Sequence, residues 1–177
     1  MNSLVKNIIR FIFFILVQVF VLNKIPPLHQ LATPYIYFLF ILWLPFKIGR
    51  RTLMIIALAL GLCLDYFTKT PGLHAAPCVF IAYLRPFLIN VLISQEGAEA
   101  NYEEPSIRSM GFVPYFTYTA VLTLFHHGFL FLLEALQFAG LWYFVVKTSL
   151  SVVISLLIIL IVELLFVRNQ KFITNTA

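Results

Sequence analysis

The feature that most constrains this chain is its long, nearly uninterrupted apolar runs, such as residues 149–167. In hydrocarbon every backbone N–H and C=O needs an internal partner, so only helices or a closed barrel can span a membrane. A barrel strand shows about 10 residues of alternating polarity, a pattern these runs lack. Hydrophobic residues make up 62% of the chain and charged residues only 11%, against about 25% charged in soluble domains. The sequence therefore predicts an all-α, polytopic transmembrane helical bundle.

A bilayer core of about 30 Å needs about 20 helical residues. The predicted spans cover residues 7–23, 26–46, 53–68, 73–93, 112–134 and 141–167, about six in all, and residues 94–111 form a polar loop. The second span is the least well supported, because its unbroken apolar core runs only from Tyr35 to Phe46. The first span resembles a signal peptide, but the residues after it offer no small-residue cleavage site, which favours an uncleaved anchor. Residues 1–177 are thus expected to form a single integral membrane domain.

Basic residues predict the orientation, because cytoplasmic segments are enriched in Lys and Arg. With six spans and both termini cytoplasmic, the inner segments hold eight basic residues and the outer loops three. The inner residues are Lys6, Arg10, Lys47, Arg50, Arg51, Arg108, Arg168 and Lys171, and the outer residues are Lys24, Lys69 and Lys147. If the second segment were re-entrant and did not cross the membrane, the excess of basic residues in the inner segments over the outer loops would be smaller. Residues 94–111 then form a cytoplasmic loop, which is either a solvated connector or an acidic docking strip for a basic partner surface.

Several function classes have no support in the sequence. The net charge of +5 reflects basic residues at the ends of apolar runs, so no nucleic-acid binding is expected. Cys63 and Cys78 lie inside apolar runs without clustered histidines, which is typical of small buried residues rather than of a zinc site. No catalytic motif and no phosphate-binding glycine loop occurs in the sequence. We therefore expect no enzyme activity, no metal and no cofactor.

Ionisable groups inside a span are costly and are candidates for function. Ala57, Gly61 and Asp65 repeat every four residues and share a helix face on which a neighbouring backbone can approach closely. Asp65 is then either a buried structural carboxylate or part of a binding site. It could pair with Arg85, although the estimated depths of the two differ, and Arg85 could instead extend to the cytoplasmic surface.

The fifth span carries a polar stripe that includes His127 and ends near Glu134, as expected for a seam between helices. Eight residues together form the predicted partner-binding or structural seam. They are Ala57, Gly61, Asp65, Gly72, His74, Arg85, His127 and Glu134.

Residues 61–75 read GLCLDYFTKTPGLHA. This stretch resembles the signature of the rod-shape-determining membrane protein family MreD, in which a Gly-x-x-x-Asp helix end meets a short Pro/Gly turn and a new helix. Gly61, Asp65, Gly72, His74 and Ala75 match that pattern. Residues 82–86, 126–127 and 133–135 are also similar to the family.

The resemblance implies a non-enzymatic component of the bacterial cell-elongation machinery in the cytoplasmic (inner) membrane. Its expected partners are MreC, MreB, RodA and penicillin-binding protein 2, besides the lipid bilayer. The family's fold is similar to that of the substrate-binding subunits of energy-coupling-factor vitamin transporters. A small-molecule-binding transporter subunit, with Asp65 and His74 lining an outward pocket, is therefore the alternative. The first span contains no alanine, whereas those subunits use alanines there to dock their energy module, and this argues against transport.

Overall fold

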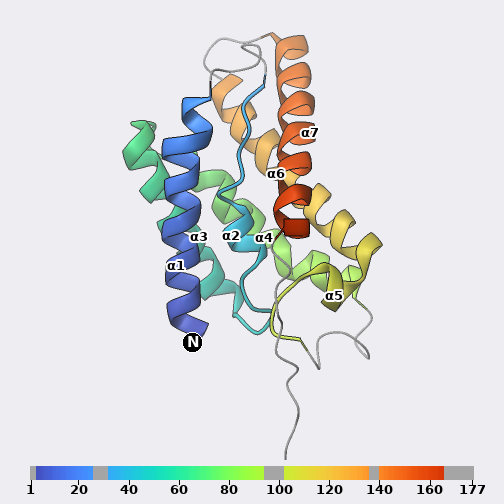
Figure 1. The fold of residues 1–177 in the computed structure, drawn as a ribbon. Coiled ribbons are helices and arrows are strands. Elements are labelled where there is room, and N and C mark those ends of the chain that lie inside the picture. Colours follow the sequence, from blue (N-terminus) through green and yellow to red (C-terminus); the bar gives the residue numbers. More distant parts are fainter. Residues whose placement is uncertain (1–2, 26–31, 94–101, 136–139, 166–177) are drawn as a thin grey trace, which may run out of the picture.

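The computed structural model describes residues 3–25, 32–93, 102–135 and 140–165 (Figure 1). Five helices in these ranges are long and apolar enough to cross a membrane. They are α1 (Ser3–Leu16) with its extensions η1 (Val17–Val21) and η2 (Leu22–Lys24), α3 (Arg50–Thr68), α4 (Ala75–Leu92), α6 (Phe112–Ala135) and α7 (Leu141–Leu165). Two short helices, α2 (Leu39–Leu42) and α5 (Ile107–Met110), lie between them. Five of the predicted spans are thus confirmed as helices that could cross a membrane.

The second predicted span is the exception. Of residues 26–46, the first six lie outside the described residues, and only Leu39–Leu42 of the remainder is α-helical. Two prolines in this stretch disfavour a continuous helix, although α4 accommodates Pro86 in its interior. Pro34 and Pro45 provide no backbone N–H, and each proline also moves the residue before it away from the helical region of backbone conformation. The prediction of a continuous helix over 26–46 is therefore wrong. We call residues 32–46 the buried segment.

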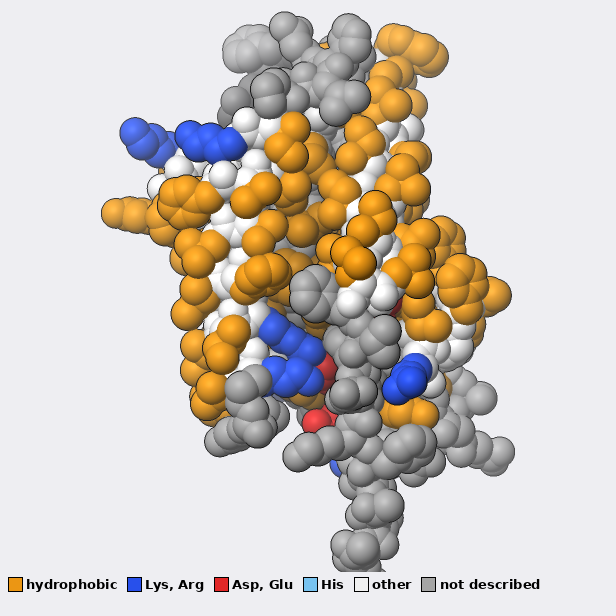
Figure 2. All heavy atoms as spheres, viewed as in Figure 1, with side chains coloured by type: hydrophobic (Ala, Val, Ile, Leu, Met, Phe, Trp, Pro, Cys, Tyr) orange, Lys and Arg blue, Asp and Glu red, His pale blue; other side chains and the backbone are white. Residues whose placement is uncertain are grey.

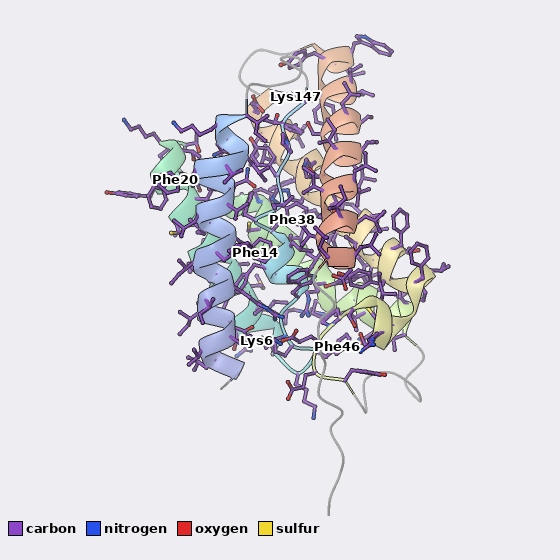
Figure 3. The ribbon with its side chains drawn as sticks, in the orientation of Figure 1. Lys6, Phe14, Phe20, Phe38, Phe46 and Lys147 are labelled. Carbon is purple, nitrogen blue, oxygen red and sulfur yellow. The ribbon has the colours of Figure 1, made fainter. Side chains whose placement is uncertain are left out.

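The buried segment runs through the interior of the bundle. In Figure 1 it descends between α1 and α7 from the end where η2 lies, passes through α2 and reaches the end where α3 begins. In Figure 3, Phe38 lies at mid-height of the bundle, whereas Phe46 lies toward the same end as Lys6. Around this segment α3 packs on α4, α4 on α6 and α6 on α7, while α1 contacts α2 and α3.

The buried segment supplies much of the hydrophobic core. Tyr37, Phe38, Leu39, Ile41 and Leu42 are each fully buried. Aromatic contacts attach α1 to it, with the Phe11 ring 5.5 Å from that of Phe40 and the Phe14 ring 5.4 Å from that of Trp43. The segment is therefore the centre about which the helices pack.

The outer surfaces of the long helices are apolar. Figure 2 shows a face dominated by hydrophobic side chains, with a few separate groups of Lys and Arg on it, one of them beside acidic side chains. Every long helix exposes large hydrophobic side chains. Examples are Ile55, Tyr66, Val113, Trp142 and Leu164. Surfaces of this kind are stable only in contact with lipid or with other membrane helices. The molecule is therefore a multi-pass membrane protein.

Candidate functional site

The turn between α3 and α4 is organised around the Asp65 carboxylate. One oxygen, Oδ1, accepts the backbone N–H of His74 at 2.9 Å. The other oxygen, Oδ2, accepts the N–H groups of Gly72 at 3.0 Å and Ala75 at 3.1 Å. These N–H groups precede or begin α4, where the first turn of a helix has no internal acceptors. A carboxylate is also favoured at this position by the positive end of the helix dipole. Asp65, near the end of α3, thus caps the beginning of α4.

Side chains complete this junction. The Nδ1 atom of His74 lies 2.8 Å from Asp65 Oδ1, and both side chains are almost fully buried. The Thr70 hydroxyl lies 3.4 Å from the same oxygen. Lys69 and Gly72 take left-handed backbone conformations, with φ of 58° and 83°. The Lys69 N–H donates to the Asp65 carbonyl, so residue 65 organises both sides of the turn.

Gly61 is required by a close approach of the two helices. A Cβ atom at this position would lie 2.3 Å from the Ala75 Cα atom and 2.7 Å from the Ala75 nitrogen. The expectation that a neighbouring backbone approaches the face of Ala57 and Gly61 is thus met by α4 of the same chain. Ala57 lies on this face, one turn before Gly61, and is fully buried. The residues that resemble the MreD signature are the ones that make this junction.

A second group of polar side chains satisfies the backbone of the buried segment. Non-helical backbone is tolerated at membrane depth only where protein groups or water satisfy it. From α7, the hydroxyls of Ser151 and Ser155 accept the N–H groups of Thr33 and Tyr35, each at 3.0 Å. His127 on α6 supports this arrangement, because its Nε2 atom lies 3.0 Å from the Ser155 hydroxyl. The polar stripes on α6 and α7 therefore face this segment.

Gln18 supports the segment from the side of α1. Its Oε1 atom accepts the N–H of Ile36 at 3.0 Å, and its Nε2 atom donates to the carbonyl of Pro34 at 3.2 Å. Gln18 lies in the π-helical turn η1 and is fully buried. The irregular turn thus places an amide against extended backbone, a role that the sequence analysis missed.

Arg85 holds the other end of the buried segment. Its guanidinium donates to the carbonyl of Leu44 through Nη2 and to the hydroxyl of Tyr118 through Nε at 2.9 Å. Tyr118 in turn donates to the carbonyl of Leu42 at 3.0 Å. The side chain of Arg85 is 1% exposed. Its predicted extension to the cytoplasmic surface is therefore wrong, and within the described residues it forms no ion pair with Asp65.

The polar loop before α6 is also bound to the bundle where the structure describes it. Glu104 is buried and pairs with Lys6 at 3.0 Å and Arg10 at 2.9 Å, both on α1. The Arg10 guanidinium also lies over the Trp43 ring, 5.6 Å from its centroid. At Glu104 the loop is therefore neither a solvated connector nor a free acidic strip. The first eight residues of the predicted loop, 94–101, lie outside the described residues.

Glu134 lies at the opposite end of the bundle. It pairs with Lys147 at 2.6 Å, and its side chain is 45% exposed. Beside it is an open cleft of about 610 Å³ between the α3–α4 turn and α6. The lining residues are Lys69, Thr70, Pro71, Gly72, Leu73, Ala76, Leu133 and Glu134. Asp65 and His74 are not in this lining, because both are turned into the helix junction.

The chemistry of these groups is that of structural hydrogen bonding. Among the described residues no three His, Cys, Asp or Glu side chains gather closely enough to hold a metal ion. Comparison with protein-family models, with curated proteins and with solved structures finds no match.

Proposed function

We propose that this chain is a non-enzymatic membrane scaffold of the bacterial cell-elongation machinery, which binds MreC through its membrane helices. One observation carries the proposal. The five residues that resemble the MreD signature, Gly61, Asp65, Gly72, His74 and Ala75, meet in one hydrogen-bonded junction. A chance match of short motifs gives no reason for the matching residues to act on one another. In the junction each of these five residues has a structural role.

The architecture also suits a scaffold better than an enzyme. Several polar side chains inside the bundle bind the protein's own backbone, as at Gln18, Arg85 and Ser155. The surface left for interactions is mainly the apolar exterior of the helices. A protein of this kind recognises partners chiefly through other transmembrane helices. MreC is the direct partner in this proposal, and MreB, RodA and penicillin-binding protein 2 belong to the same assembly.

In the proposed topology both termini are cytoplasmic and the protein lies in the inner membrane. The buried segment then serves as the second crossing, although it is not a continuous helix. Supporting this, α1 begins and the buried segment finishes toward the same end of the bundle (Figures 1 and 3). The pairing of Lys6 and Arg10 with Glu104 places the start of α1 beside the loop before α6, as the six-crossing topology requires.

Depletion in the native bacterium tests the proposal. Loss of the chain should convert rod-shaped cells to spheres, and the tagged wild-type chain should co-purify with MreC from detergent-solubilised membranes. An Asp65→Ala variant should restore shape poorly because the junction is lost, whereas the half-exposed Glu134→Gln should restore it. Normal rods after depletion, together with no recovery of MreC, would falsify the proposal.

A substrate-binding transporter subunit is the second candidate, favoured by the open cleft of about 610 Å³ beside Glu134. Such a volume falls within the usual range for small-molecule sites. The cleft lacks the two side chains that the transport hypothesis assigned to it, Asp65 and His74. Uptake of a vitamin that depends on this chain, or a small molecule retained through purification, would favour this candidate. Normal uptake without the chain and no retained ligand would exclude it.

A further inference from the structure

The open cleft beside Glu134 lies at the end of the bundle where α3 and α6 end and α4 begins. We call it the α4–α6 cleft. In Figure 3, Lys147, the ion-pair partner of Glu134, lies at the opposite end of the bundle from Lys6. Membrane spans end near the boundary of the hydrocarbon core. The cleft therefore lies at the level of the lipid headgroups. Its walls are the turn through residues 69–73, Ala76 on α4, and Leu133 and Glu134 on α6.

The cleft carries one charged group from the turn and one from α6. Lys69 is exposed, and among the described residues its ammonium forms no ion pair or hydrogen bond. Glu134 accepts the Lys147 ammonium through Oε1 at 2.6 Å, and its other oxygen, Oε2, has no partner among the described residues. Lys147 itself is buried and does not line the cleft. The cleft thus offers a ligand one ammonium and one carboxylate oxygen.

An apolar surface continues from the cleft along α4 and α6. Phe80 lies one turn beyond Ala76 on α4, and Phe129 lies one turn before Leu133 on α6. The rings of Phe80 and Phe129 contact each other, with centroids 5.1 Å apart, and Phe125 packs on Phe80 at 5.8 Å. Phe125 is 43% exposed, so this aromatic surface reaches the outside of the bundle. It runs from the helix ends toward the middle of the spans, as a lipid acyl chain runs from its headgroup.

We propose that the α4–α6 cleft binds the headgroup of a phospholipid that carries a primary ammonium, as phosphatidylethanolamine does. The phosphate pairs with Lys69, the ammonium donates to Glu134, and an acyl chain lies along the phenylalanines of α4 and α6. This inference does not rest on the proposed scaffold function.

The chemistry of the cleft selects this lipid among common phospholipids. A carboxylate only accepts hydrogen bonds, so it binds a group with N–H donors. Phosphatidylglycerol brings no cation to Glu134, and the quaternary ammonium of phosphatidylcholine has no N–H to donate. A water-soluble zwitterion would satisfy both charges, but it has no group that covers the apolar surface beside the cleft.

Competition among lipids tests the site. The purified chain is mixed in micelles with equal amounts of phosphatidylethanolamine, phosphatidylglycerol and phosphatidylcholine of the same acyl chains, and the bound lipid is identified by native mass spectrometry. The wild type should retain phosphatidylethanolamine over each of the others by about two- to fivefold, the range for an exposed ion pair. Glu134→Gln should lose this preference, because its amide carries no charge for the ammonium. Equal retention of the three lipids by the wild type, or an unchanged preference in Glu134→Gln, would overturn the inference.

The phosphate contact is tested by Lys69→Gln, which should lower retention of all three lipids. Lys24→Gln is the matched control, because Lys24 is exposed at the end of α1 on the same side of the bundle and does not line the cleft. It should retain lipid as the wild type does. An equal loss for Lys24→Gln and Lys69→Gln would refute a phosphate site at Lys69.

Two further measurements separate a lipid from a soluble ligand and do not depend on the charged variants. Glycerophosphoethanolamine, which has the same headgroup without acyl chains, should compete only weakly with the lipid, and displacement of the lipid at equal concentration would contradict the acyl-chain contact. A photoreactive leucine analogue at Leu73, in vesicles of equal phosphatidylethanolamine and phosphatidylglycerol, should crosslink mainly to phosphatidylethanolamine. The same analogue at Leu62, which is 50% exposed on α3 and outside the lining, should capture both lipids equally. Equal capture at Leu73 would count against the site.

Discussion

Removing the Asp65 carboxylate should destabilise the protein more than removing any exposed acid. In Asp65→Ala three backbone N–H groups lose their acceptor, those of Gly72, His74 and Ala75. Gly72 is exposed, so water can replace its lost bond, whereas His74 and Ala75 are buried. The substitution therefore leaves two buried donors without an acceptor.

The magnitude follows from those two donors. A buried donor left unsatisfied costs about 1–3 kcal/mol, so Asp65→Ala should lower the free energy of unfolding by about 2–6 kcal/mol. The stability of Asp65→Asn should lie between that of Asp65→Ala and that of the wild type. Its carbonyl can still accept from His74, but its amide nitrogen faces Ala75 and leaves one buried donor unsatisfied, at about 1–3 kcal/mol.

Unfolding of the purified chain in mixed micelles, followed by circular dichroism, measures these differences. Glu103→Ala is the control, because Glu103 is exposed. Substitutions at exposed positions usually change stability by no more than about 0.5 kcal/mol. The order of stability should be wild type, Glu103→Ala, Asp65→Asn and Asp65→Ala. A loss for Asp65→Ala no larger than that for Glu103→Ala would refute the capping argument.

Three further predictions follow from other contacts, of which the first two are measured by the same unfolding experiment and the third by proteolysis. Gly61→Ala should cost about 1–3 kcal/mol, since its methyl group meets the α4 backbone, whereas Gly128→Ala in α6, with open space around it, should stabilise by up to about 1 kcal/mol. Ser155→Ala should cost about 1–3 kcal/mol because the N–H of the buried segment loses its acceptor, and equal stability of Ser155→Ala and the exposed Ser149→Ala would contradict this. Glu104→Ala should expose the start of α1 to proteolysis, because two ion pairs to α1 disappear, and unchanged cleavage would count against that role.

The five long helices were predictable because helix formation in lipid depends on local sequence. Each helix satisfies its own backbone, so a run of apolar residues of sufficient length is enough to identify it. The face of Gly61 and Asp65 was predictable for a similar reason, since residues four apart share a side of a helix. The partner on that face was not predictable, because it is set by the turn through residues 69–74.

The buried segment was mispredicted because its apolar composition is the same in a helix and in an extended chain. Pro34 and Pro45 were local signals against a continuous helix, but prolines alone do not exclude one, since Pro86 lies inside α4. The other residues that determine the conformation of the buried segment lie on other helices. Gln18, Arg85 and Ser155 each look like isolated polar residues in apolar runs, and their common task emerges only when the extended backbone is placed among them.

This distribution has a consequence for biosynthesis. The segment's N–H groups at Thr33 and Tyr35 bond to serines that follow them by 118 and 120 residues. While the chain is being made, those acceptors do not yet exist, and the segment cannot enter lipid as a helix does. We therefore expect this segment to take its final place only after α7 has been synthesised. In the proposed topology, the second crossing would then be completed after crossings that follow it in the sequence.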